Sequence, residues 1–233
     1  MYYSAIGRSP VPTTTTPRCR RSSCPNVPRN CTVYQVVCAL LGGRQTDDAE
    51  SLAVSMAERS TASARTDQPS LLSVSGALWL IAALAAGRRA DRSQAVRCLD
   101  HADRLARLLG TDGNHAWTAF GPTNVAIHRV SVAAELGDPA AAVAAAAAVD
   151  VDRMPVGLLG RRAQVHLDLA WAQAKRKRDA DATLHLLEAE RLAPESIRYN
   201  ILARETMWEM LSRQRARPNR VVNDLALRAG VLG

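Results

Sequence analysis

The chain has 233 residues, of which 47% are hydrophobic, only 4% are aromatic and 22% are charged, and its formal net charge is +8. This length and this apolar content suffice for a buried core, which excludes a wholly disordered chain. Abundant alanine with short β-branched runs favours helix over strand, so the composition predicts an all-α protein.

Residues 1–31 differ in composition from the rest of the chain. They combine prolines and a run of threonines with five arginines and no acidic residue: Arg8, Arg18, Arg20, Arg21 and Arg29. This segment lacks apolar periodicity, so we expect it to be a disordered basic tail that is solvated rather than bound to nucleic acid. The tail supplies +5 of the +8, which leaves residues 32–233 close to charge balance.

The five cysteines give no indication of a metal site. Cys19, Cys24, Cys31 and Cys38 lie early in the chain and Cys98 stands alone, without C-x2-C spacing and without a nearby histidine. We therefore expect no metal or other cofactor. The odd count and the lack of a secretory leader predict a cytoplasmic protein with free thiols.

A two-helix unit recurs from residue 32 onward. Each unit contains an apolar helix, a short basic or glycine break, and an alanine-rich second helix, over residues 33–58, 76–110, 124–149 and 163–195. Four alanines of the second helices are equivalent at intervals of 46, 47 and 40 residues: Ala49, Ala95, Ala142 and Ala182. Small residues there allow the first helix to approach closely, and stacked hairpins bury a shared core.

The fourth unit is the clearest of these hairpins. Its second helix places small residues, leucines and a proline at offsets 0, 4, 7, 10 and 12: Ala182, Leu186, Ala189, Leu192 and Pro194. This resembles the tetratricopeptide repeat, although the units exceed its usual period of ~34 residues. The excess falls in the linkers 60–70, 110–121 and 150–160. The pattern predicts a tetratricopeptide-like array of helical hairpins, an α-solenoid, over residues 32–233.

Two segments of this array need separate interpretations. Residues 68–87 carry no charge, but Gln68, Pro69 and three serines dilute their apolar character, so we expect a buried helix rather than a membrane span. After the fourth unit, residues 196–215 are expected to form one amphipathic helix and residues 219–233 a short terminal helix. The motif DLALRAGV resembles the first half of a helix-turn-helix, but no recognition helix follows it, so we expect an end cap.

Catalytic patterns are missing from the sequence. It contains no G-x-S-x-G, P-loop, Rossmann or HExxH motif. The histidines lie in different units and form no cluster with carboxylates: His101, His115, His128, His166 and His185. His166 and Asp168 are two residues apart on a helix and so point to different faces. We therefore expect a protein that is not an enzyme.

Polar side chains recur at helical spacing on the first helices. In the third unit, one helix face carries four polar residues: Asn124, His128, Ser131 and Glu135. In the fourth unit, the corresponding face carries Arg162, His166 and Gln173. The helix that follows the fourth unit repeats the four-residue spacing with Asn200 and Arg204. First helices line the concave surface of tetratricopeptide arrays, where such residues would form a groove for an extended peptide. The predicted contacts are Asn124, His128, Arg129, Arg162, His166, Asn200 and Arg204.

The stretch HAWTAFGPTNVAIHR, residues 115–129, holds two of the few aromatic residues. Gly121 and Pro122 predict a helix start, since proline is tolerated in the first turn. Large aromatic side chains usually fill interior gaps, so we expect Trp117 and Phe120 to fill the junction between the second and third hairpins. Direct contact of both residues with a ligand is the alternative.

The segments HAWTAFGPTNVAIHRVSVAAELGD, LLGRRAQVHLDLAWAQAKRKRDADATLHLLEAERLAPE and RYNILARE resemble the C-terminal part of actinobacterial, Streptomyces-type helix-turn-helix regulators of the xenobiotic-response-element family. The resemblance spans residues 45–233 and is specific in WTAFGPTN. In that family an N-terminal helix-turn-helix domain binds DNA, and a tetratricopeptide-like domain senses a ligand or mediates oligomerisation. Residues 1–31 are not a helix-turn-helix domain, so the resemblance implies the sensory domain without DNA binding.

These observations together predict a cytoplasmic, non-catalytic module in transcriptional regulation that binds a peptide or protein segment in its concave groove. A first alternative is an assembly module that forms a homodimer through its terminal helices, around Trp208 and Met210. A second alternative is a small-molecule receptor whose aromatic pocket contains Trp117 and Phe120.

Overall fold

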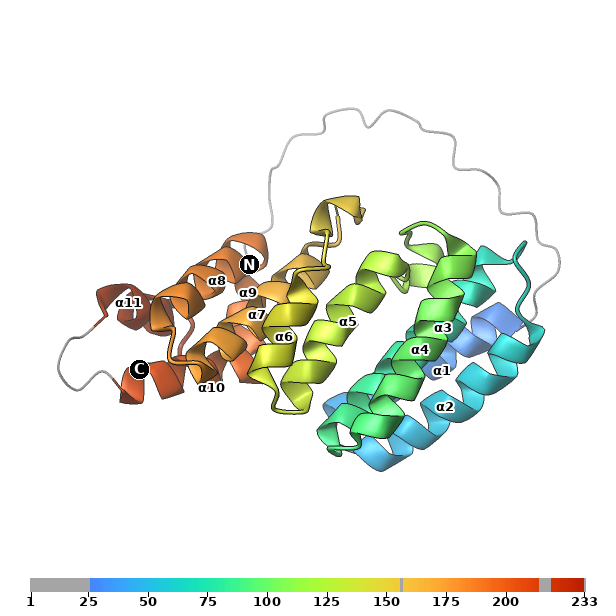
Figure 1. Ribbon diagram of the computed structural model, residues 1–233, viewed down its shortest axis with the longest axis horizontal. Helices are drawn as coiled ribbons and strands as arrows, with labels where there is room; N and C mark the ends of the chain where they lie inside the picture. The colour runs from blue at the N-terminus through green and yellow to red at the C-terminus, as the bar shows by residue number, and fades with distance from the viewer. Residues whose placement is uncertain (1–25, 156, 214–218, 233) are drawn as a thin grey trace, which may run out of the picture.

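The computed structural model describes residues 26–155, 157–213 and 219–232, and this part of the chain contains eleven α-helices, two 3-10 turns and no strand (Figure 1). The predicted all-α class is confirmed. The predicted basic tail lies outside the described residues as far as residue 25. The first helix begins at Asn26, six residues earlier than the predicted boundary at residue 32.

The first eight α-helices form four consecutive hairpins. They are α1 (Asn26–Gly42) with α2 (Thr46–Ser63), α3 (Pro69–Arg88) with α4 (Arg92–Leu109), α5 (Pro122–Glu135) with α6 (Pro139–Ala146), and α7 (Leu159–Lys175) with α8 (Asp179–Leu192). The 3-10 turns η1 (His115–Trp117) and η2 (Val151–Arg153) lie in the linkers before the third and fourth hairpins. Each first helix packs on the next first helix, so the hairpins stack in chain order.

The same turn closes all four hairpins. The residue two positions after each first helix has a positive φ: Arg44, Ala90, Gly137 and Lys177. In each turn the following backbone N–H bonds to the carbonyl five residues earlier, as Asp91 does with Ala86 at 2.9 Å. This is a Schellman motif, in which a left-handed residue ends the helix. Only one of the four positions is glycine. The four turns therefore share a backbone conformation that the sequence pattern does not reveal.

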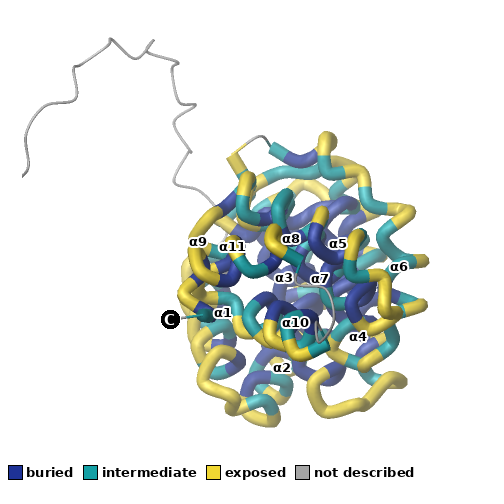
Figure 2. Tube along the Cα trace, turned by 90° about the vertical axis from the view of Figure 1, so that its left-hand side faces the viewer, coloured by how far each residue is buried: buried dark blue, intermediate teal, exposed yellow. Residues whose placement is uncertain are grey.

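The aligned alanines lie at the interior of these hairpins. Each is fully buried on its second helix: Ala49, Ala95, Ala142 and Ala182. Figure 2 shows that the described helices bury one side toward the interior and expose the other at the surface. The small residues therefore lie where two helices approach most closely, as the alignment predicted.

Helix α3 forms the centre of the largest apolar cluster. It is long and apolar enough to cross a membrane, and 89% of its most apolar window is buried inside the fold. Helices α1, α2, α4 and α5 cover it. The expectation of a buried core helix over residues 68–87 is confirmed.

Three shorter helices end the described chain: α9 (Pro194–Tyr199), α10 (Ile201–Ser212) and α11 (Arg220–Arg228). The single helix predicted over residues 196–215 is wrong, because the backbone at Asn200 is extended and its side chain accepts a hydrogen bond from the N–H of Ala203 at 3.1 Å. Asn200 therefore caps a new helix. Helix α11 buries Val222, Leu225 and Ala226 and packs on α10 and α8, as expected of an end cap.

Candidate functional site

The central residues of the predicted groove lie inside the protein. Asn124 is 1% exposed and His128 is 4% exposed. The Nδ1–H of His128 donates to the carbonyl of Asn124 at 2.9 Å, and burial lowers the pKa of His128 to about 3, with the nearby Arg161 as a second cause. His128 is therefore a neutral interior residue. The prediction that Asn124 and His128 face an open groove is wrong.

Of the other two polar residues predicted on this face of α5, Glu135 pairs with Arg88 of α3 at 2.9 Å, and Ser131 joins a buried network between α5 and α7. The Ser131 hydroxyl donates to Asp168 Oδ2 at 2.5 Å, and the Gln164 amide donates to Asp168 Oδ1 at 2.8 Å. Burial raises the pKa of Asp168 to about 7, although both hydrogen bonds oppose the shift and Glu135 adds to it. This carboxyl group links the third hairpin to the fourth.

Two further predicted contacts connect elements of the fold. The Arg129 guanidinium lies 4.0 Å from Asp100 and 3.8 Å from Asp103, both on α4. Arg162 donates to the carbonyl of Met154 at 3.2 Å and lies 3.7 Å from Asp152. Arg129 thus approaches the preceding hairpin, and Arg162 holds the linker before α7, so neither faces a shared groove with His128.

The two aromatic residues of WTAFGPTN have opposite environments. Phe120 is fully buried against Gly76 of α3, where an added Cβ would lie 2.0 Å from the phenyl ring. Trp117 is 86% exposed, and the backbone reverses direction around it through positive φ angles at Ala116, Trp117 and Ala119. The junction role is confirmed for Phe120 and wrong for Trp117. A pocket formed by both rings is excluded by the same geometry.

The start of α5 explains the rest of this motif. Asp112 caps the helix, because its carboxylate accepts hydrogen bonds from the N–H and the hydroxyl of Thr123 at 2.9 and 2.7 Å. A Cβ at Gly121 would lie 2.4 Å from Asp112 Oδ1, so only glycine allows this approach. Pro122 occupies the first helical turn, as predicted.

Sequence reasoning missed one pair of histidines. His166 on α7 and His185 on α8 bring their Nδ1 atoms to 3.1 Å, with ring centroids 5.4 Å apart. His166 therefore turns toward its own hairpin partner, whereas Asp168 turns toward α5, as the two-residue spacing predicted. The available signal was that both histidines lie on the two helices of one hairpin, within a few turns of the connection between α7 and α8.

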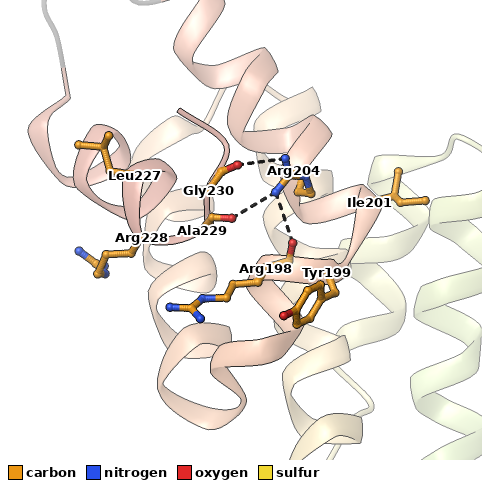
Figure 3. A pocket seen from close by; sticks show the side chains of 8 residues that line it. All are labelled: Arg198, Tyr199, Ile201, Arg204, Leu227, Arg228, Ala229 and Gly230. Atoms are coloured by element: carbon orange, nitrogen blue, oxygen red, sulfur yellow. Dashed lines mark hydrogen bonds between the residues drawn. The ribbon is translucent and has the colours of Figure 1, made fainter. Parts of the chain in front are cut away.

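A pocket of about 650 Å³ opens at the C-terminal end of the array, and we call it the terminal pocket. Helices α9, α10 and the end of α11 form it from eight residues: Arg198, Tyr199, Ile201, Arg204, Leu227, Arg228, Ala229 and Gly230 (Figure 3). Arg204 fixes its shape, because the guanidinium donates to the carbonyls of Ala229 and Gly230 at 3.1 Å and of Arg198 at 3.3 Å. Arg204 is thus the predicted contact that reaches an open cavity, and Asn200 beside it is a helix cap.

The terminal pocket combines positive charge with exposed apolar side chains. None of its lining residues is acidic, and within the described part of the chain the Arg198 guanidinium makes no hydrogen bond or ion pair. Arg228 donates two hydrogen bonds to Glu190, which lowers the pKa of that carboxyl. Tyr199, Ile201 and Leu227 are all more than half exposed. Figure 3 shows Arg198 and Arg228 reaching to one side of the pocket and Tyr199 and Ile201 lying on the other.

Two further observations limit the chemistry of the described residues. Among them, no group of three or more histidine, cysteine or acidic side chains has the geometry of a metal site. Cys31, Cys38 and Cys98 are free thiols, while Cys19 and Cys24 lie outside the described residues. No protein-family model, no curated protein and no solved structure matches the chain.

Proposed function

We propose that the chain is a non-catalytic, tetratricopeptide-like repeat module that binds an acidic peptide or protein segment at the terminal pocket. Four stacked hairpins with equivalent buried alanines and identical Schellman turns support the solenoid assignment. Its place in transcriptional regulation, without DNA binding or membrane attachment by this chain, rests on the sequence resemblance over residues 45–233. A cytoplasmic location is part of the same proposal.

The composition of the terminal pocket carries this proposal. Exposed apolar side chains are costly to leave in water and favour association, and the two arginines beside them, which share the carboxylate of Glu190, give the pocket a net positive charge. A segment with an acidic residue near an aromatic or aliphatic anchor would pair with Arg198 and cover Tyr199 and Ile201. The volume of about 650 Å³ suits one large anchoring side chain with its neighbours.

The location differs from the concave groove expected from the sequence. Asn124, His128 and Ser131 on the first helix of the third hairpin are buried, so they offer few accessible groups to a peptide. The terminal pocket lies at the end of the array, where no further hairpin covers α9 and α10 among the described residues (Figure 1).

Charge reversal at Arg198 tests the proposal. A display library of random peptides selected on the wild-type chain is expected to enrich acidic peptides that carry an aromatic or large aliphatic residue. Arg198→Glu should weaken the selected peptides by about fivefold or more, because it replaces an attraction of up to about 1 kcal/mol with a repulsion. Tyr199→Ala should weaken them similarly through lost apolar contact.

Arg65→Glu serves as the matched control. Arg65 is exposed in the α2–α3 linker, next to Asp67, and lies outside the terminal pocket. Its reversal alters the net charge of the protein by the same amount as Arg198→Glu but should leave peptide affinity unchanged. Enrichment of neutral or basic peptides, or equal affinity for the Arg198→Glu variant, would contradict the proposal.

A second candidate function is assembly through the terminal helices, which an exposed aromatic residue favours. Trp208 on α10 is 54% exposed, whereas Met210 is fully buried, so only Trp208 is available at the surface. If it forms a homodimer interface, Trp208→Ser should convert a dimer to a monomer in light scattering at increasing protein concentration. A wild-type chain that remains monomeric throughout would rule out this alternative.

A further inference from the structure

We propose that His166 and His185 form a binding site for a divalent transition-metal ion between α7 and α8. The two Nδ1 atoms lie 3.1 Å apart. Imidazole nitrogens bind zinc at about 2.0–2.1 Å, and two of them at an angle of about 100° around one ion are separated by about 3.1 Å. The pair therefore already has the separation that two ligands of one metal ion require.

The contact between the two Nδ1 atoms can hold either one proton, as a hydrogen bond between neutral rings, or one metal ion. If neither Nδ1 carries a proton, two lone pairs face each other, so one proton or one metal ion must lie between the nitrogens. Burial lowers the pKa of both histidines, and each ring disfavours a second charge on the other, which the lowered pKa of His185 reflects.

Two acidic residues lie on the same face of α8 as His185. Asp181 lies one turn before His185 on α8 and Glu188 lies one turn after it, so all three share a face. Each carboxylate currently pairs with an arginine, Arg178 at 2.7 Å and Arg191 at 2.6 Å. The two imidazoles are therefore the protein ligands of the proposed site, because among the described residues no third histidine, cysteine or acidic side chain joins them in a metal-binding group, and water would fill the other positions.

The ligand type limits the choice of metal. Imidazole nitrogens suit zinc, nickel and copper, whereas magnesium and calcium require oxygen ligands. Both rings are half-buried rather than enclosed, so an ion can reach the nitrogens from solvent. We therefore assign the site to the zinc class. A bound ion would link the two helices of the fourth hairpin, whose Glu190 also holds Arg228 at the terminal pocket.

Isothermal titration of the full, reduced chain with zinc chloride tests this site, with magnesium chloride as the comparison ion. Zinc is expected to bind and to raise the melting temperature, whereas magnesium should do neither. His166→Ala and His185→Ala should each weaken zinc binding by at least about tenfold, as expected when a ligand is lost. His115→Ala removes a histidine outside the site and should leave zinc affinity unchanged.

The cysteines provide the competing explanation, and the variants distinguish it. If zinc binds equally to wild type, His166→Ala and His185→Ala, the ion is held elsewhere and the proposal is overturned. His185→Gln keeps a polar side chain at the position and guards against a folding defect, which circular dichroism would reveal in the alanine variant. Zinc binding that persists near pH 6.5 supports histidine ligands, because burial raises the pKa of Cys31, Cys38 and Cys98. Loss of binding already at that pH would count against them.

Discussion

Replacing Phe120 with alanine is expected to lower the free energy of unfolding by about 3–5 kcal/mol, as for other fully buried phenylalanines. The ring lies against Gly76 of α3, in a notch that no Cβ could occupy. It belongs to the same apolar cluster as α3 and the start of α5, so its loss leaves a cavity where the second and third hairpins meet. Chemical unfolding in urea, followed by circular dichroism, measures the change.

Trp117→Ala is the matched control for this prediction. Trp117 lies three residues away in the same motif but is 86% exposed. Its removal should alter stability by no more than about 0.5 kcal/mol, which is typical of a surface position. Equal destabilisation by the two substitutions would contradict the view that Phe120 alone fills the junction. A loss of peptide binding in Trp117→Ala would instead give the exposed ring a functional role.

The sequence was sufficient to predict the helical hairpins, because their signals are local. Apolar periodicity, glycine or basic breaks and recurring alanines all occur within one hairpin, and the structure places Ala49, Ala95, Ala142 and Ala182 at equivalent buried positions. The start of α5 was predictable for the same reason, since Gly121 and Pro122 act within one turn.

The candidate site was poorly predictable, because it depends on how closely the hairpins stack. A row of polar residues on one helix face has the same sequence spacing whether the next hairpin buries that face or leaves it exposed. In this fold α7 covers α5, which converts Asn124, His128 and Ser131 from expected groove residues into interior ones. The terminal pocket depends on a helix break at Asn200 that the periodic pattern concealed. Arg204 was chosen for its spacing and reaches the pocket through that break.

Asp168→Asn is expected to stabilise the protein above neutral pH and to remove part of its pH dependence. The folded pKa of Asp168 is about 7, whereas an unfolded aspartate titrates near 3.9. The folded state therefore holds the proton more tightly. The contribution of protonated Asp168 to the free energy of unfolding is fully present below about pH 4 and is lost as the pH rises through about 7. A shift of about three pKa units corresponds to a loss of about 4 kcal/mol at the upper end of this window.

Asparagine is nearly isosteric and never ionises, so the variant avoids this loss. Its carbonyl can accept from Ser131, and the Gln164 amide can rotate to accept from the new NH2 group. The measurement is the free energy of unfolding in urea at several values between about pH 5 and 8. The variant's advantage should grow across this range. The contribution from His128, whose lowered pKa acts in the opposite sense, is common to both proteins and cancels in the difference.

A constant difference across that pH range would contradict the assignment of the titration to Asp168. If the difference in free energy of unfolding grows with pH, the contacts of the Asp168 carboxyl group indicate which part of the protein is weakened. Asp168 joins α7 to Ser131 of α5, so ionisation weakens the junction between the third and fourth hairpins before it affects either hairpin alone. Amide hydrogen exchange in α5 and α7 should therefore accelerate with pH beyond its intrinsic increase in the wild type, and Asp168→Asn should suppress this excess.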